Sequence, residues 1–246
     1  MRHLILILGD QLDRRSAASD GFDARADVVW MTEASHESTK VWVSKPRIAV
    51  FLAAMRQFAA ALRADRIAVD YRSLDGELDV EGHGQPSGNG HGNRDGDGDD
   101  AAAAAAAERS ATTLEARLAA TLRRRRPERV IVVEPGEWSL RETLRAVVSA
   151  AGLPWEERPD RHFLCSREAF AAHAHGRRQL RMEYFYRDMR RQHRVLLDAD
   201  GGPEGGEWNY DVENRGSFGQ GGPLALDPPP RSPLAFPPDS LTRGVL

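Results

Sequence analysis

Polar residues that could hold a ligand follow three separate apolar runs of this sequence. They are Gly9, Asp10 and Gln11 after Leu4–Leu8, Glu33 after Asp27–Met31, and Glu134, Gly136 and Glu137 after Arg129–Val133. If the runs are parallel strands of one sheet, their carboxyl ends border the crevice in which such sheets bind ligands. Carboxylates and amides gathered there can hydrogen-bond a heterocycle or a polyol. Asp10 and Glu137 can equally cap helices and match helix dipoles, so both interpretations stay open.

Motifs for phosphate binding, metal binding and nucleophilic catalysis are missing from these positions. The first apolar run is followed by GDQL, which is neither GxGxxG nor GxxxxGK[ST], so a standard dinucleotide or P-loop enzyme is disfavoured. The histidines do not form HExxH, and Ser139, Ser166 and Cys165 lack a nucleophile motif such as GxSxG. We therefore predict no catalytic residue and no metal ligand. Because Cys165 is the single cysteine, no intrachain disulfide can form and an iron–sulfur cluster lacks ligands.

The elements that must position these residues alternate between strand and helix along the chain. Strands are predicted at Leu4–Leu8, Asp27–Met31, Ile67–Tyr71, Arg129–Val133 and Pro154–Arg158. Helices are predicted from near Lys45 to Leu62, at Ala111–Arg126 and at Glu137–Ala151, where apolar residues recur at helical spacing. Strands that alternate with helices indicate an α/β fold with a doubly wound, parallel, five-stranded sheet.

The segment Gly76–Ala107 interrupts this pattern. It is rich in Gly, Asp and His and ends in seven alanines, so it cannot bury enough apolar surface to fold, and we predict a disordered insertion. Asp95, Asp97 and Asp99 alternate as calcium-loop ligands do. The position that should carry the bidentate glutamate is Ala106, so an EF-hand is excluded.

The composition changes after about residue 165. Ser166–Ala174 is predicted as a short helix with Ser166 as its N-cap, and Gln179–Arg194 as a basic, aromatic helix. Arginines beside aromatic residues suit nucleic acid, but Met182, Phe185, Tyr186 and Met189 share one helical face, which favours packing on a neighbouring domain. The remainder is rich in Gly and Pro and predicts an extended connector. We assign residues 1–165 to the α/β domain and 166–246 to helix and linker.

Composition limits the classes of partner and compartment. The 246 residues carry a net charge of −3, which argues against a protein that coats nucleic acid. The mean hydropathy is −0.53 and no apolar run is long enough to cross a bilayer, so no membrane partner is predicted. No secretory signal follows Met1, and we expect a cytoplasmic protein.

Several longer strings, taken in order over nearly the whole chain, resemble one family. They are LILILGDQL at Leu4–Leu12, EASHESTKVWVSKPRIAVFLAAMRQFA at Glu33–Ala59, EPGEW at Glu134–Trp138, RHFLCS at Arg161–Ser166, GRRQLRMEYFYRDMR at Gly176–Arg190 and GGEWNYDVENR at Gly205–Arg215. Together they resemble the bacterial deoxyribodipyrimidine photolyase-related proteins, the cryptochrome/photolyase branch that carries an iron–sulfur cluster.

The resemblance implies a Rossmann-like antenna domain over residues 1–165, which in such a relative holds 6,7-dimethyl-8-ribityllumazine to collect light. Lys45 is counted among the cofactor-binding residues, and this sequence departs from the family pattern there, because the His/Lys-rich run that usually precedes the long antenna helix is reduced to Val43, Ser44 and Lys45. FAD, the cluster cysteines and the pocket for damaged DNA belong to a helical domain that would follow Leu246.

Two functions therefore stay open from the sequence. One is a photolyase/cryptochrome-related protein for light-dependent DNA repair or photoreception, lacking the FAD and iron–sulfur domain and inactive by itself, with a separate helical FAD-binding polypeptide as a partner. The alternative is a non-catalytic α/β module that binds a pigment or a partner.

Overall fold

The computed structural model describes residues 1–246 except 35–41, 75–77, 80–112, 212–215 and 217–230. The described residues form two compact units, Met1–Arg161 with Pro238–Leu246, and His162–Pro237. The first unit contains the sheet, and the second contains two helices.

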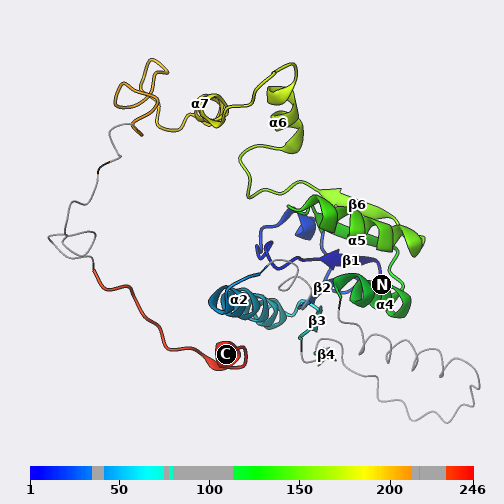
Figure 1. Cartoon of the computed structure of the whole chain (residues 1–246). Coiled ribbons are helices and arrows are strands. Elements are labelled where there is room, and N and C mark those ends of the chain that lie inside the picture. The colour runs from blue at the N-terminus through cyan, green and yellow to red at the C-terminus, as the bar shows by residue number, and fades with distance from the viewer. Residues whose placement is uncertain (35–41, 75–77, 80–112, 212–215, 217–230) are drawn as a thin grey trace, which may run out of the picture. The chain divides into compact units, whose positions relative to one another are not determined.

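A twisted sheet with the order β4-β3-β2-β1-β5-β6 forms the centre of the first unit (Figure 1). Ile5 of the central strand β1 lies opposite Val29 on one side and Ile131 on the other, both in parallel register. The strands are β1 His3–Leu6, β2 Val28–Thr32, β3 Val69–Arg72, β4 Leu78–Asp79, β5 Arg129–Val133 and β6 Trp155–Arg158. Strands β1, β2, β3, β5 and β6 are parallel, which confirms the predicted five-stranded parallel sheet.

The short strand β4 corrects one prediction. It pairs antiparallel with β3, with Leu78 opposite Arg72 and Asp79 opposite Tyr71. We predicted a disordered insertion from Gly76, but two residues of that segment extend the sheet. Backbone hydrogen bonds to the edge of β3 need no apolar side chain, so composition did not reveal them. The rest of the insertion, including Asp95, Asp97 and Asp99, lies outside the described residues.

Helices cover both faces of the sheet, as the doubly wound prediction requires. Side chains of β1 alternate between the faces: Ile5 points to one core and Leu4 and Leu6 to the other. Met55, Ala59 and Leu62 of α2 pack on the Ile5 face with η1, while Leu118 of α4 and Leu144 of α5 pack on the Leu4 face (Figure 1). The elements are η1 Ala17–Ser19, α2 Lys45–Ala64, α4 Leu114–Arg125 and α5 Trp138–Ala150.

Residues that favour a helix N-terminus stand at the starts of α2 and α4. Helix α2 begins at Lys45 with Pro46 in its first turn, where the missing N–H of proline costs no helix bond. Helix α4 is capped by Thr113, whose hydroxyl accepts the N–H of Ala116. Both starts lie at the end of the unit to which the carboxyl ends of the strands point, since the helices run antiparallel to parallel strands.

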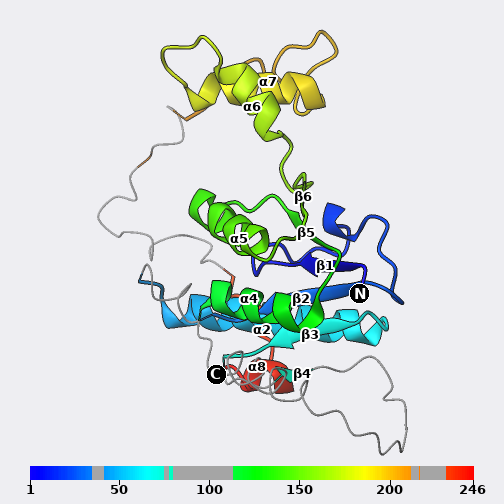
Figure 2. The ribbon, with the colours of Figure 1, turned by 90° about the vertical axis from the view of Figure 1, so that its right-hand side faces the viewer.

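The last residues of the chain return to the first unit. Helix α8, Ser240–Arg243, is capped by Asp239 and lies against α2 in both ribbon views (Figures 1 and 2). The Asp239 carboxylate accepts a hydrogen bond from Gln57, and Arg56 Nη1 donates to the Gly244 carbonyl at 3.1 Å. These contacts tie residues 238–246 to the helix that covers one face of the sheet.

The second unit is built on helices α6, Arg167–Ala174, and α7, Met182–His193. Ser166 caps α6 as predicted, its hydroxyl accepting the N–H of Ala169 at 3.2 Å. Phe185 of α7 meets Phe170 of α6 edge to face, with ring centroids 5.2 Å apart. Only part of the predicted apolar face of α7 is therefore covered in this unit, because Met182 and Tyr186 stay exposed.

No helix among the described residues is long and apolar enough to cross a membrane. No group of three or more His, Cys, Asp or Glu side chains in that part of the chain is placed to hold a metal ion.

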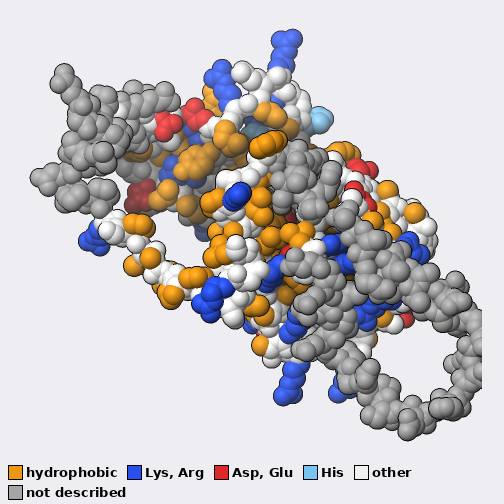
Figure 3. All heavy atoms as spheres, turned by 60° about the horizontal axis from the view of Figure 1, so that its bottom comes forward, with side chains coloured by type: hydrophobic (Ala, Val, Ile, Leu, Met, Phe, Trp, Pro, Cys, Tyr) orange, Lys and Arg blue, Asp and Glu red, His pale blue; other side chains and the backbone are white. Residues whose placement is uncertain are grey.

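On the face shown in Figure 3, exposed hydrophobic side chains lie beside Lys and Arg side chains.

Candidate functional site

A pocket of about 260 Å³ lies in the first unit at the carboxyl ends of β1 and β2. From β1 the chain winds outward to β2 on one side and later to β5 on the other, so the pocket borders the point where strand order reverses. Its lining is mostly apolar, with a few charged side chains: Ile7, Leu8, Gly9, Asp10, Trp30, Thr32, Glu33, Ala34, Arg47, Phe51, Leu52, Met55, Leu114, Glu137 and Leu140.

Gly9 allows helix α2 to approach the end of β1. A Cβ built on Gly9 would lie 2.4 Å from Phe51 Cε1 and 2.9 Å from Met55 Sδ, closer than real contacts allow. The absence of a side chain at Gly9 therefore lets Phe51 and Met55 reach the floor of the pocket. The glycine acts through close packing and places an aromatic ring against the strand end.

Glu33 lines the pocket, but its carboxylate is engaged inside the protein. Arg56 Nε and Nη2 donate to its two oxygens at 2.6 and 2.9 Å, the Tyr71 hydroxyl donates at 2.6 Å, and the N–H of Leu74 donates at 2.8 Å. Burial raises the pKa of the Glu33 carboxyl, but the hydrogen bonds from Arg56, Tyr71 and Leu74 outweigh burial and hold that pKa below its usual range. Glu33 is therefore a buried anion that joins β2, α2 and β3.

The same hydrogen-bond network raises the pKa values of two partners of Glu33, Tyr71 and Arg56. Burial and the hydrogen bond to Glu33 raise the pKa of the Tyr71 hydroxyl, so Tyr71 remains a neutral donor. The hydrogen bond to Glu33 raises the pKa of the Arg56 guanidinium. The three side chains hold one charge arrangement beneath the pocket over the physiological pH range.

Gln11 joins the end of β1 to the end of β5. Its Nε2 donates to the carbonyls of Val133 and Glu134 at 3.3 and 3.0 Å, and the side chain is buried. Among the described residues its Oε1 has no hydrogen-bond partner. Gln11 does not line the pocket, and its contacts position the turn that leads to Glu137 instead.

Asp10 and Glu137 bring exposed carboxylates to the pocket from two different strand ends. Asp10 makes no side-chain hydrogen bond or ion pair with the residues that the structure describes, whereas Glu137 accepts a hydrogen bond from the Ser139 hydroxyl. Asp10 Oδ2 lies 3.9 Å from a Cβ built on Gly136, so Gly136 borders the Asp10 carboxylate. The pocket thus has polar groups at its edge that can bind hydroxyl groups of a ligand.

The structure therefore brings four of the predicted ligand-binding residues, Gly9, Asp10, Glu33 and Glu137, to one pocket. Gln11, Glu134, Gly136 and Lys45 do not line it. Glu134 continues the pairing of β5 with β6 through its N–H to Arg158, and Lys45 is exposed at the first residue of α2.

Trp30, Arg47 and Leu140 are among the pocket residues that did not enter the sequence-based site. Arg47 lies one helical turn before Phe51 on α2, and this i, i+4 spacing is the signal that could have found it. Trp30 and Leu140 belong to apolar patterns that equally describe core, so their place at the pocket depends on the tertiary fold.

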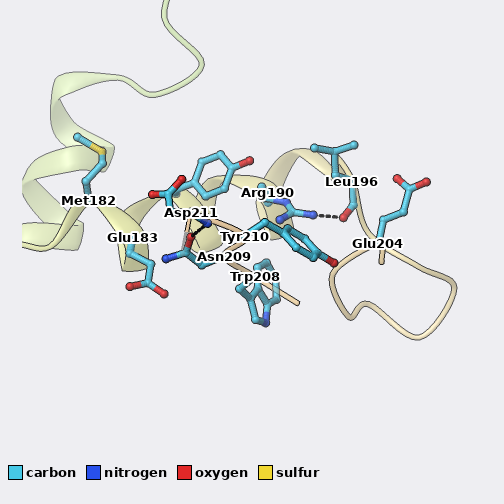
Figure 4. A pocket seen from close by; sticks show the side chains of 10 residues that line it. Met182, Glu183, Arg190, Leu196, Glu204, Trp208, Asn209, Tyr210 and Asp211 are labelled. Atoms are coloured by element: carbon cyan, nitrogen blue, oxygen red, sulfur yellow. Dashed lines mark hydrogen bonds between the residues drawn. The ribbon is translucent and has the colours of Figure 1, made fainter. Parts of the chain in front are cut away.

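The second unit has a cavity of its own, of about 720 Å³, beside α7 (Figure 4). Trp208 lies against three arginines, with the guanidinium carbons of Arg187, Arg190 and Arg191 at 5.5, 5.0 and 4.7 Å from its ring centroid. Arg190 is buried and donates to the carbonyls of Val195 and Leu196. These contacts fasten the segment after α7 to the helix, so we assign Trp208 and Arg190 a structural role and take the sheet pocket as the candidate site.

Comparison with known proteins finds similar sequences. The chain matches the family model described as "Deoxyribodipyrimidine photo-lyase-related protein" over residues 5–86 and 100–246. It is 35% identical over 246 residues to a "(6-4) photolyase" of Agrobacterium fabrum. That match covers the whole of this chain and 41% of the relative, so the chain spans less than half the length of the curated relative.

Proposed function

Because this chain belongs to the deoxyribodipyrimidine photolyase-related family, we propose that it is the pigment-binding part of a cytoplasmic protein for light-dependent DNA repair. Its sheet pocket would hold a light-collecting chromophore of the 6,7-dimethyl-8-ribityllumazine class. The observation that carries the proposal is the pocket itself, where apolar walls and exposed polar groups meet at the carboxyl ends of β1 and β2.

The residues present suit a flat ring with a polyol chain. Phe51, Leu52 and Met55 supply apolar surface for the ring, and the volume of about 260 Å³ is close to the lower end, about 300 Å³, of typical small-molecule sites. The Asp10 carboxylate can accept hydrogen bonds from hydroxyl groups, and Arg47 can donate them. When bound, such a pigment absorbs light and passes the excitation to an acceptor.

FAD does not fit this pocket. A dinucleotide needs a much larger site and a phosphate-binding turn, and the first βα turn carries GDQL in place of a glycine-rich fingerprint. An iron–sulfur cluster needs several cysteine ligands and this chain has only Cys165. We therefore propose that FAD, any cluster and the pocket for damaged DNA are supplied by polypeptide outside residues 1–246.

A fluorescence titration of the chain with 6,7-dimethyl-8-ribityllumazine tests the proposal. We expect saturable binding that weakens at least tenfold in Phe51→Ala, because the ring loses its aromatic wall. Asp10→Asn should weaken binding less, since an amide oxygen still accepts hydrogen bonds. Phe163→Ala, at an exposed phenylalanine of the second unit, is the matched control and should bind as the unmodified chain does.

Two outcomes would contradict the proposal. Absence of saturable binding by the folded chain would show that the pocket is not a lumazine site. Equal affinity in Phe51→Ala and in the control would show that the pigment binds elsewhere. Circular dichroism of each variant confirms that lost binding does not reflect lost structure.

A further inference from the structure

A second cavity of the first unit, of about 640 Å³, lies at the opposite, amino-terminal edge of the sheet. It is formed by residues at or just before the starts of β1, β2 and β5 and by the last turn of α4, and it shares no residue with the pocket described above. Four arginines line it: Arg2, Arg25, Arg124 and Arg125. The carboxylates on its lining are Asp27 and Glu128.

Three of these arginines are held in place by buried carboxylates. Arg2 Nε donates to Asp27 Oδ1 at 2.9 Å, and the Asp27 side chain is fully buried. Asp70 Oδ2 accepts from Arg124 Nη2 and from Arg125 Nε, both at 2.9 Å, and Asp70 is only 2% exposed. The three arginine side chains themselves keep between 25% and 37% of their surface exposed.

The arrangement fixes the guanidinium planes and leaves N–H groups available. Arg125 uses Nε for Asp70, so its two terminal nitrogens can donate elsewhere. The Arg25 guanidinium is exposed and makes no hydrogen bond or ion pair with the described residues. A ligand would therefore meet one donor that is already ordered, Arg125, which lowers the entropic cost of binding, and one guanidinium with no competing partner among the described residues, Arg25.

The pairing of charges leaves one cation for an anion. Asp27 and Asp70 are occupied in neutralising Arg2, Arg124 and Arg125, whereas the Arg25 guanidinium has no ion pair with the described residues; Asp23 and Glu128 are the other carboxylates close to Arg2. Planar guanidinium groups match the oxygens of a phosphate by paired hydrogen bonds.

We propose that this amino-terminal cavity binds a phosphate group, with Arg25 and Arg125 as the principal donors. The phosphate can belong to a free phosphate compound or to the backbone of a nucleic acid, and both present the same anionic oxygens. The site does not depend on pigment binding, because the two cavities lie at opposite edges of the sheet.

Isothermal titration of the full chain with inorganic phosphate, at ionic strength held constant with sodium chloride, tests the proposal. We expect saturable binding that weakens about tenfold in Arg25→Ala, since one charged hydrogen-bonding partner is removed. Arg25→Ala is the informative variant because the Arg25 guanidinium makes no hydrogen bond or ion pair with the described residues. Arg145→Ala, at an exposed arginine of α5, is the matched control and should leave the affinity unchanged.

A second titration, with a short DNA duplex, distinguishes the source of the phosphate. Tight duplex binding that is lost in Arg25→Ala would assign the site to a nucleic-acid backbone, and binding of inorganic phosphate alone would assign it to a small compound. The proposal is overturned if neither titrant binds, or if Arg25→Ala and Arg145→Ala weaken binding equally through general charge. Lumazine binding should be the same in Arg25→Ala and the unmodified chain, which separates this test from that of the proposed function.

Discussion

The Tyr71 hydroxyl donates a 2.6 Å hydrogen bond to Glu33 Oε1, and this bond joins β3 to the end of β2 beneath the candidate pocket. Both side chains are buried, and Arg56 from α2 neutralises the carboxylate. The polar groups beneath the pocket therefore already satisfy one another. Hydrogen bonds to a ligand must come from the exposed groups at the edge, such as Asp10.

Removing Arg56 should strongly destabilise the first unit. In Arg56→Met the Glu33 carboxylate stays buried without its countercharge, and breaking a buried pair in this way costs about 3–5 kcal/mol. Urea unfolding measures the loss. Arg47→Met, at an exposed arginine on the same helix, is the control and should change the free energy of unfolding by less than about 0.5 kcal/mol. Equal effects of the two substitutions would show that the Glu33 pair adds nothing specific.

Acid should weaken the protein partly through Glu33. Because the pKa of Glu33 is lowered in the folded state, its contribution to stability is fully present above its unfolded pKa, about 4.3. That contribution is lost as the pH falls through the lower folded pKa. Glu33→Gln cannot titrate, so the difference in unfolding free energy between the unmodified chain and the variant should shrink from about pH 5 toward pH 2. A difference that stays constant over this range would contradict the lowered pKa.

A side chain at position 9 should disturb both packing and the pocket. Gly9→Val forces Phe51 and Met55 away from the strand end, and overpacking of this kind costs about 1–3 kcal/mol. Gly136→Ala is the control, because its Cβ would meet only Asp10 Oδ2 at an ordinary 3.9 Å. Thermal unfolding should show a lower midpoint for Gly9→Val and little change for Gly136→Ala. If Gly9→Val unfolded at the same temperature as the unmodified chain, the close approach of α2 would not need a glycine.

Trp208 should protect helix α7 from proteolysis. The ring contacts three arginines, and each such contact contributes about 0.5–1 kcal/mol at an exposed site. In Trp208→Ala we expect trypsin to cleave severalfold faster after Arg190 and Arg191, as mass spectrometry of limited digests can follow. Trp42→Ala removes a fully exposed tryptophan of the first unit and should leave these cleavage rates unchanged. Unaltered digestion of Trp208→Ala would mean that the segment after α7 is held by other contacts.

Apolar patterning was sufficient to predict the parallel sheet and its helices. The run Leu4–Leu8 is continuous because β1 is buried on both faces, and Leu118 and Leu122 recur at helical spacing because one side of α4 packs on the sheet. The strand β4 was missed, because its pairing with β3 depends on backbone groups that every residue carries.

The sequence by itself determined the fold class and placed Gly9, Asp10, Glu33 and Glu137 at strand ends, because in a parallel sheet the carboxyl ends of the strands share one edge. Only the tertiary structure decided what each residue does there. Glu33 is neutralised by Arg56, which lies 23 positions away, and Gln11 bonds to carbonyls more than 120 positions away, so neither role has a local signal. At the opposite edge, the bonds from Arg2 to Asp27 and from Arg124 and Arg125 to Asp70 likewise join residues that are far apart in the sequence and form only in the folded chain.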